Sequence, residues 1–233
     1  MYLTQVRFDI LRVRVPKGVF SESGKIWNRL EQEVLPAQTA LLLQKNGLRV
    51  ARGKLEDWRP IRALLDAEPH VTTGQNAITM NNGLPLLLEL HAEPRDQLLF
   101  LYRPGGTLVG APFRMSTNVL RIEYSVPLHD ADALEIEMMP EIQLQHLPSS
   151  NTLRRPDELA QVPVPPGRIL RELAFRITLQ PGEFVTVGPS PAANEIPYVA
   201  GALLLCDELD GKRYESMFFI TPQVSQTGRS DGS

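Results

Sequence analysis

The sequence predicts an α+β protein, in which a small N-terminal α/β unit is followed by a mainly antiparallel β-domain. Apolar residues recur at helical spacing within the first 68 residues, and from His70 onward they alternate at the period of two that half-buried strands require. Turn sequences rich in glycine, proline and asparagine separate the alternating runs. We therefore predict one domain at 1–68, a second at 69–224 and a disordered tail at 225–233.

The N-terminal unit begins with a strand pattern at residues 4–15. Its apolar positions change phase between Ile10 and Leu11, so that they lie first on one face of the strand and then on the other. One extra residue at this point would produce the change. We therefore expect a β-bulge or a change of partner strand.

Three helices and one short strand are expected in the rest of this unit. Pro36 is tolerated in the first turn of a helix, Asp57 can cap a helix, and Gly47 is a usual residue at a helix end. The expected helices cover 21–34, 36–47 and 57–65, and the expected strand covers 48–52.

The β-domain begins with short candidate strands joined by glycine-containing turns. The leucine-rich run at 84–102 also has amphipathic helical spacing, but Pro85 and Pro94 bracket it and favour strands. Residues 149–167 are rich in proline and predict a surface excursion with at most one helical turn. The candidate strands are 77–80, 84–90, 98–103, 107–109 and a long hairpin at 119–145.

The C-terminal part, residues 168–224, predicts a β-meander. Apolar residues alternate from Leu173 to Leu179, Pro181 and Gly182 then turn the chain, and a second apolar run covers 184–187. Two final strands, 202–206 and 214–220, are expected to form a hairpin. The Asp210-Gly211 step supplies the positive φ that a tight hairpin turn needs.

Three short motifs occur in this meander: PGEFVTVG at 181–188, NEIPYVAG at 194–201 and MFFITPQV at 217–224. Their order resembles the end of the secretins, the ring-forming outer-membrane channels of bacterial secretion and pilus systems. The hairpin at 119–145 resembles the preceding family hairpin, so the resemblance covers roughly 118–224. Pro189 stands where the family usually has a second glycine, and no amphipathic segment for entering the outer membrane is visible.

The resemblance implies a non-enzymatic structural or assembly protein of the bacterial cell envelope, secretin-like and involved in protein secretion. In a secretin ring, every protomer donates strands to one shared barrel. The resemblance therefore implies self-association or other envelope partners. The implied location is the periplasm or the outer membrane, although direct membrane insertion is not expected. Residues 217–220 are apolar on both faces, so either another layer of the same chain or another subunit must cover them.

Two other functions remain open at this point. A soluble β-sandwich could bind a peptide or a glycan through the excursion at 149–167, without channel activity. A hydrolase could assemble its site from residues that are dispersed along the sequence, and such a site would need a polar pocket near a histidine.

No catalytic, cofactor-binding or metal-binding residue is predicted. The histidines lack a neighbouring ligand at metal-site spacing, and structural roles are expected for them. Cys206 lies in an apolar run and is expected to be a small buried side chain. Acidic residues at 130–141 are expected on a solvated strand face rather than around a cation. The four histidines are His70, His91, His129 and His146.

The charges and apolar runs of the sequence argue against nucleic acid as a partner, against a membrane-spanning helix and against a signal peptide. The 24 Lys and Arg against 27 Asp and Glu give no electrostatic reason to expect nucleic acid. No stretch approaches the roughly 20 apolar residues of a membrane-spanning helix. Charges at Arg7, Asp9, Arg12 and Arg14 exclude the apolar core of a signal peptide. If the protein is exported, we expect its leader to be missing from this sequence; otherwise it is cytoplasmic.

Overall fold

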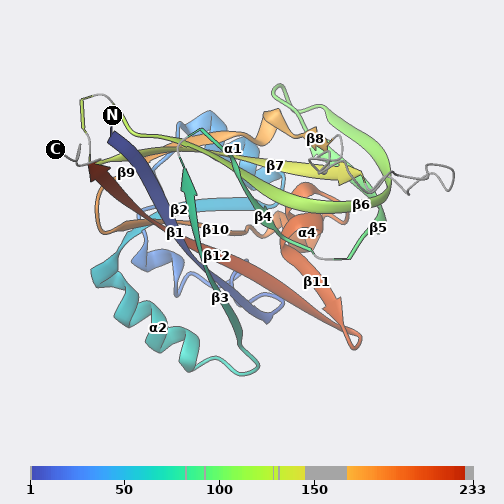
Figure 1. Cartoon of the computed structure of the whole chain (residues 1–233). Helices are drawn as coiled ribbons and strands as arrows, with labels where there is room; N and C mark the ends of the chain where they lie inside the picture. Colours follow the sequence, from blue (N-terminus) through green and yellow to red (C-terminus); the bar gives the residue numbers. More distant parts are fainter. Residues whose placement is uncertain are drawn as a thin grey trace, which may run out of the picture.

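The computed structural model describes residues 2–81, 83–91, 93–127, 129–130, 132–144 and 167–228. These residues form two antiparallel sheets and a few short helices (Figure 1). The predicted α+β class with mainly antiparallel strands is therefore confirmed. Within these ranges, no helix is long and apolar enough to cross a membrane.

Sheet A joins the two ends of the chain. Its strand order is β2-β10-β12-β1-β3, and β11 also pairs with β12. The central pair, β1 and β12, is antiparallel without interruption from Tyr2 opposite Gly228 to Pro16 opposite Tyr214. The strands are β1 (Tyr2–Pro16), β2 (Leu48–Lys54), β3 (Thr72–Asn81), β10 (Glu183–Pro189), β11 (Cys206–Leu209) and β12 (Lys212–Gly228).

Sheet B is built on the long hairpin of β6 and β7. Strands β4 and β5 pair with the outer side of β6, and β8 and β9 pair with the outer side of β7. The register between β5 and β6 shifts near Arg95, where Met115 has a φ of 41°. The strands are β4 (Leu86–Glu89), β5 (Arg95–Tyr102), β6 (Leu108–Ser125), β7 (Leu134–Leu144), β8 (Gly167–Ile169) and β9 (Phe175–Leu179).

The helices are short and lie around the sheets. Two predicted helices are confirmed as α1 and α2. The predicted helix at 21–34 is wrong beyond its single 3-10 turn, because the backbone of Glu31 exchanges hydrogen bonds of 2.8 Å with that of Arg52 in β2. The elements are η1 (Trp27–Arg29), α1 (Ala37–Lys45), η2 (Leu55–Asp57), α2 (Trp58–Asp66), η3 (Arg171–Leu173), α3 (Ala192–Glu195) and α4 (Ala200–Leu205).

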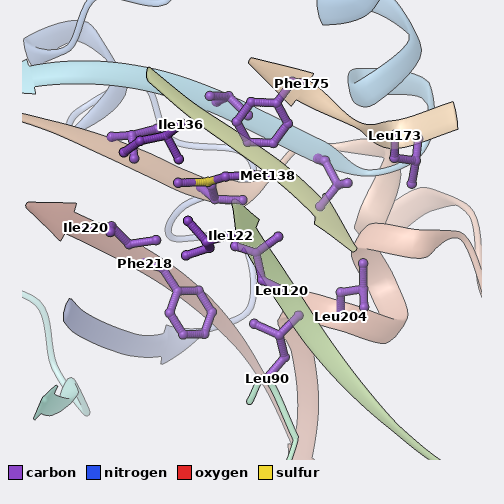
Figure 2. Close-up of a cluster of buried hydrophobic side chains, with 14 of the residues drawn as sticks. Leu90, Leu120, Ile122, Ile136, Met138, Leu173, Phe175, Leu204, Phe218 and Ile220 are labelled. Carbon is purple, nitrogen blue, oxygen red and sulfur yellow. The ribbon is translucent and has the colours of Figure 1, made fainter. Parts of the chain in front are cut away.

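The main core lies between the two sheets, and we call it the inter-sheet core. Figure 2 shows Phe218 and Ile220 of β12 directed toward Ile122 of β6 and Ile136 of β7. Leu204 of α4 closes one end of this core. These side chains are at most 2% exposed, so the contact between the sheets excludes water.

A second core covers the opposite face of sheet A, and we call it the outer core. It is formed by side chains of sheet A, of α2 and of the segment 19–30. The Trp58 ring lies edge-on to Phe184 and Phe219, with ring centroids 6.2 and 5.2 Å apart. Sheet A is therefore buried on both faces along part of its length.

The phase change in the first strand has a different cause from the predicted bulge. Strand β1 keeps one register with β12 and one with β3, so the expected bulge or change of partner is wrong. Phe8 and Ile10 face the inter-sheet core, whereas Leu11 and Val13 face the outer core. The two halves of one regular strand thus bury opposite faces.

Several predicted boundaries differ from the structure. The boundary at residue 68 does not separate the sheets, because β1 and β2 pair with the C-terminal strands β12 and β10. The tail predicted from 225 is a strand as far as Gly228, and 229–233 lie outside the described residues. The predicted strand at 202–206 is instead helix α4 as far as Leu205, and strand β11 begins at Cys206. The hairpin turn at Asp210-Gly211 is confirmed, with φ of 52° and 71°.

Candidate functional site

The apolar ribbon at 217–220 is covered by its own chain. Phe218 and Ile220 lie in the inter-sheet core, Met217 and Phe219 lie in the outer core, and all four are at most 3% exposed. Strand β12 also has a partner strand on each side, β1 and β10. Of the two alternatives left open by the sequence, cover by the same chain is correct, so this ribbon is no interaction surface.

Strand β3 is a free edge of sheet A. It pairs with β1 from Gln5 opposite Asn81 to Arg14 opposite Thr72, and no other described strand pairs with its outer side. Figure 1 shows it beside β1 at the margin of the sheet. Its ten residues, TTGQNAITMN, contain no charged side chain and no proline. Natural edge strands are usually protected by such residues, so β3 can accept a further strand.

The other long edges are protected. On β2, the backbone pairing with Glu31 is reinforced by an ion pair of 2.7 Å between Glu31 and Arg52. On β5, the amide of Phe100 donates a hydrogen bond of 2.8 Å to the carbonyl oxygen of Tyr198. The remaining edge strands β4, β8, β9 and β11 have only three to five residues. Among the described strands, β3 is therefore the long edge that lacks such protection.

The two faces of β3 differ in polarity. Ile78 and Met80 are half-buried against the inter-sheet core, and the alternate residues Gln75, Ala77 and Thr79 are exposed on the other face. The hydroxyl group of Tyr124 donates a hydrogen bond of 2.8 Å to the carbonyl oxygen of Asn81, which anchors one end of the strand. An added strand would thus extend a sheet with one apolar and one polar face.

A cleft of about 380 Å³ opens between β1 and α2, on the face of sheet A that carries the outer core. Gln75 of β3 lines it together with Arg7 and Asp9 of β1, and Trp58 and Arg62 of α2 form its other wall. Arg7 and Asp9 form an ion pair of 2.9 Å across the floor. The cleft therefore presents hydrogen-bonding groups next to the free edge.

Asp207 is the centre of a cluster that the sequence did not reveal. Its carboxylate accepts hydrogen bonds from His91 Nδ1 at 2.7 Å and from the guanidinium groups of Arg12 and Arg14 at 3.2 and 3.1 Å. Burial by itself would raise the pKa of Asp207, but the hydrogen bond from His91 and the two arginine charges outweigh it and hold the pKa below its ordinary value. The cluster ties β1 to β11 and to the segment before β5.

This cluster gives a pH-dependent prediction. A lowered pKa means that Asp207 stabilises the fold at pH values above the ordinary pKa of 3.8, and that this contribution is lost as the pH falls below it. We expect Asp207→Asn to be less stable than the parent protein at neutral pH, and the difference to shrink below pH 3.8. Urea unfolding across the acid range measures the free energy of unfolding of the parent protein and of the variant at each pH. A constant difference would contradict the assignment, and Asp66→Asn, in an exposed pair with Arg62, is the control.

Glu215 is a second buried carboxylate, at 0% exposure. It accepts hydrogen bonds from the backbone amides of Gly18, Phe20 and Ser21 at 2.7, 2.9 and 3.0 Å. Its carboxylate also accepts hydrogen bonds from the hydroxyl group of Ser21 and, at 2.9 Å, from the side-chain amide of Asn194. Glu215 thus fixes the loop that covers one end of the outer core, which indicates a structural rather than a catalytic role.

The three described histidines lie in different parts of the fold. His70 lies in an exposed turn with a φ of 59°, His129 is exposed, and His146 lies outside the described residues. His91 is buried beside Asp207. Within the described ranges, no three His, Cys, Asp or Glu side chains could together hold a metal ion.

Cys206 is half-buried at the start of β11. Burial, reinforced by the nearby charges of Glu215 and Asp207, raises the pKa of its thiol to about 12. A thiol with this pKa stays protonated at neutral pH and is a weak nucleophile.

The acidic residues of the 130–141 hairpin are mostly paired with arginine on the outer face of sheet B. Arg176 contacts Glu135 and Glu137 at 3.1 and 3.0 Å, and Arg121 contacts Glu141 at 3.3 Å. The side chains of Glu135 and Glu137 are 36% and 34% exposed, in agreement with the solvated-face interpretation. Glu141 is only 3% exposed, so that interpretation is wrong for Glu141.

Two glycines of the sequence motifs are required by packing. A Cβ atom on Gly188 would lie 2.9 Å from the ring of Trp27, and one on Gly201 would lie 2.0 Å from the carbonyl oxygen of Gly47. The amide of Gly201 donates a hydrogen bond of 2.7 Å to the carbonyl oxygen of Asn46. Gly201 thus holds α4 against the end of α1, and Gly188 leaves room on β10 for Trp27, so both glycines serve the fold.

The search of protein-family models found no match, and the search of curated proteins also found none. Among solved structures, the chain is similar to secretins. The secretin domain of InvG from Salmonella matches with 10% identity and a TM-score of 0.26, over 100% of this chain and 64% of that chain. GspD from Escherichia coli K12 matches with 14% identity and a TM-score of 0.26, over 96% of this chain and 50% of that chain.

A third similar structure is the type II secretion system outer membrane complex of Klebsiella pneumoniae, with PulD, PulS and the PulC HR domain. The match has 13% identity and a TM-score of 0.27, over 98% of this chain and 40% of that chain. The chain thus spans 40 to 64% of these three chains. At such identities and TM-scores, the likeness assigns no role to any individual residue.

Proposed function

We propose that this chain is a non-enzymatic assembly protein of the bacterial cell envelope, involved in protein secretion, that associates through the free edge of β3. The proposal of association rests on a single observation, which is an exposed edge strand of ten residues without charge or proline. The motif series at 181–188, 194–201 and 217–224 supports the envelope and secretion part of the proposal through its resemblance to the secretins.

The physical basis is strand addition. Backbone amide and carbonyl groups on the outer side of β3 are free to pair with another strand, and each such hydrogen bond contributes about 1 kcal/mol net. The half-buried side chains of Ile78 and Met80 lie on the same face, so an added strand would also cover apolar surface. Backbone pairing gives affinity, and the side-chain pattern selects the partner.

The partner is either a second copy of the chain or another envelope protein. Among similar structures, GspD is found in a complex with the pilotin AspS, and PulD is found with PulS and the PulC HR domain. The predicted peptide or glycan site at 149–167 lies outside the described residues up to 166, so the structure offers no observation in favour of that alternative.

The native mass of the purified protein tests the proposal. We expect oligomers by light scattering, and we expect Ala77→Lys with Thr79→Lys to give monomers, because two exposed charges would prevent a strand from pairing with β3. Gln223→Lys with Ser225→Lys is the matched control, since it adds the same charge to the central strand β12. A monomeric parent protein, or equal dissociation of both variants, would refute association through β3.

A further inference from the structure

A second cleft, of about 530 Å³, lies between α1, the turn from β5 to β6, and η3. Its lining includes three cationic side chains, Lys45, Arg103 and Arg171. We call it the basic cleft. None of its lining residues belongs to β3, so it is separate from the proposed assembly edge.

The cleft carries an excess of positive charge. Arg103 lies 3.5 Å from Glu172, the one carboxylate among the described lining residues, whereas Lys45 and Arg171 form no ion pair with any described residue. Three positive charges and one negative charge leave an excess of two. The whole chain has a formal net charge of −3, so this excess is local and is not a property of the entire surface.

The wall of the cleft is partly apolar. Leu41 of α1 is 54% exposed there, and Leu42, Pro104 and Ala174 add further apolar surface. No aromatic ring is found among the described residues of the lining, so these residues offer no platform on which a sugar ring could stack. A simple anion such as phosphate would need the cations but would leave the apolar wall unused.

We propose that the basic cleft binds an acidic peptide segment that also carries aliphatic side chains. Carboxylates of the segment would pair with Lys45 and Arg171, and its aliphatic side chains would cover Leu41. Charge complementarity across an interface steers association and selects the partner, and burial of an exposed leucine adds affinity. The proposal goes beyond the proposed assembly function and does not depend on it.

The test uses a fluorescein-labelled peptide of alternating glutamate and leucine, titrated with the full chain and followed by fluorescence anisotropy. We expect saturable binding that weakens as salt is added. Lys45→Glu with Arg171→Glu should weaken it at least about tenfold, because two attractive contacts become repulsive. Arg59→Glu with Lys212→Glu is the matched control, since both residues are exposed and form no ion pair with any described residue, and it should bind as the parent protein does.

Further probes separate the alternatives. Peptides with glutamine in place of glutamate, or serine in place of leucine, should both bind more weakly. Inorganic phosphate that competes as well as the peptide would show a simple anion site and overturn the proposal. Absent binding, or equal loss in both charge-reversed variants, would also overturn it. The lysine variant of β3 should bind the peptide normally, so that failure of the assembly proposal and failure of this one can be distinguished.

Discussion

Replacement of Gly201 by alanine is expected to lower the free energy of unfolding by about 3 kcal/mol. A Cβ atom at this position would lie 2.0 Å from the carbonyl oxygen of Gly47 and 2.3 Å from its carbonyl carbon. Neither backbone can move easily, because Gly201 donates to Asn46 at 2.7 Å and Ser190 donates to Gly47 at 3.0 Å. The substitution must therefore break at least one of these hydrogen bonds or separate α4 from α1.

Steric packing and helix propensity predict opposite signs for the effect of Gly201→Ala on the free energy of unfolding. Gly201 lies in helix α4, where helix propensity alone would make alanine more stable than glycine by about 1 kcal/mol. Urea unfolding of the purified variant measures the difference. Gly74→Ala in β3 is the control, because no atom lies within 4 Å of its added Cβ, and it should change the free energy little. A stabilised Gly201→Ala protein would contradict the close approach of the two backbones.

The sequence correctly predicted several elements that are formed by residues close to one another in the chain. The Asp210-Gly211 turn, the hairpin of β6 and β7 and the helices α1 and α2 follow from residues that are close in sequence, so the patterns contain the needed information. Residues 202–205 were wrongly predicted as a strand, because a short apolar run has no period that distinguishes a helix from a strand.

Long-range pairing could not be predicted in the same way. Strands β1 and β12 lie at opposite ends of the chain, and nothing in either pattern identifies the other as its partner. For the same reason, the sequence indicated a strand at 77–80 but did not show that β3 ends the sheet. It also left open whether the same chain or another subunit covers 217–220, because the loop and helix that cover Phe219 are distant in sequence. Burial on both faces is a property of the assembled layers.

The hydrogen-bond partners of the buried carboxylates could not be predicted from the sequence either. Glu215 occupies a polar position next to an apolar run, and such a residue usually faces solvent. Its partners come from residues 18–21 and from Asn194, so the sequence offered no local sign that they would converge. A single carboxylate that satisfies three backbone amides is a strong constraint on a loop, because those amides have no other hydrogen-bond partner in the described structure.

Removal of this carboxylate is therefore expected to have a large effect. Glu215→Ala would leave the buried amides of Phe20 and Ser21 and the partly buried amide of Gly18 without an acceptor, and it should lower the free energy of unfolding by about 4 kcal/mol. Glu215→Gln keeps one acceptor oxygen but turns an amino group toward other donors, so we expect a loss of about 2 kcal/mol.

Urea unfolding of the two Glu215 variants tests this order. Glu208→Ala is the control, because its side chain is 64% exposed and lies 4.0 Å from Arg213, and it should cost less than about 0.5 kcal/mol. If charge alone mattered, the glutamine and alanine variants would lose equal stability, and the hydrogen-bond account of the loop would be wrong. If hydrogen bonding holds the loop, glutamine must lie between the parent protein and alanine, and amide hydrogen exchange at 18–21 should accelerate in the same order.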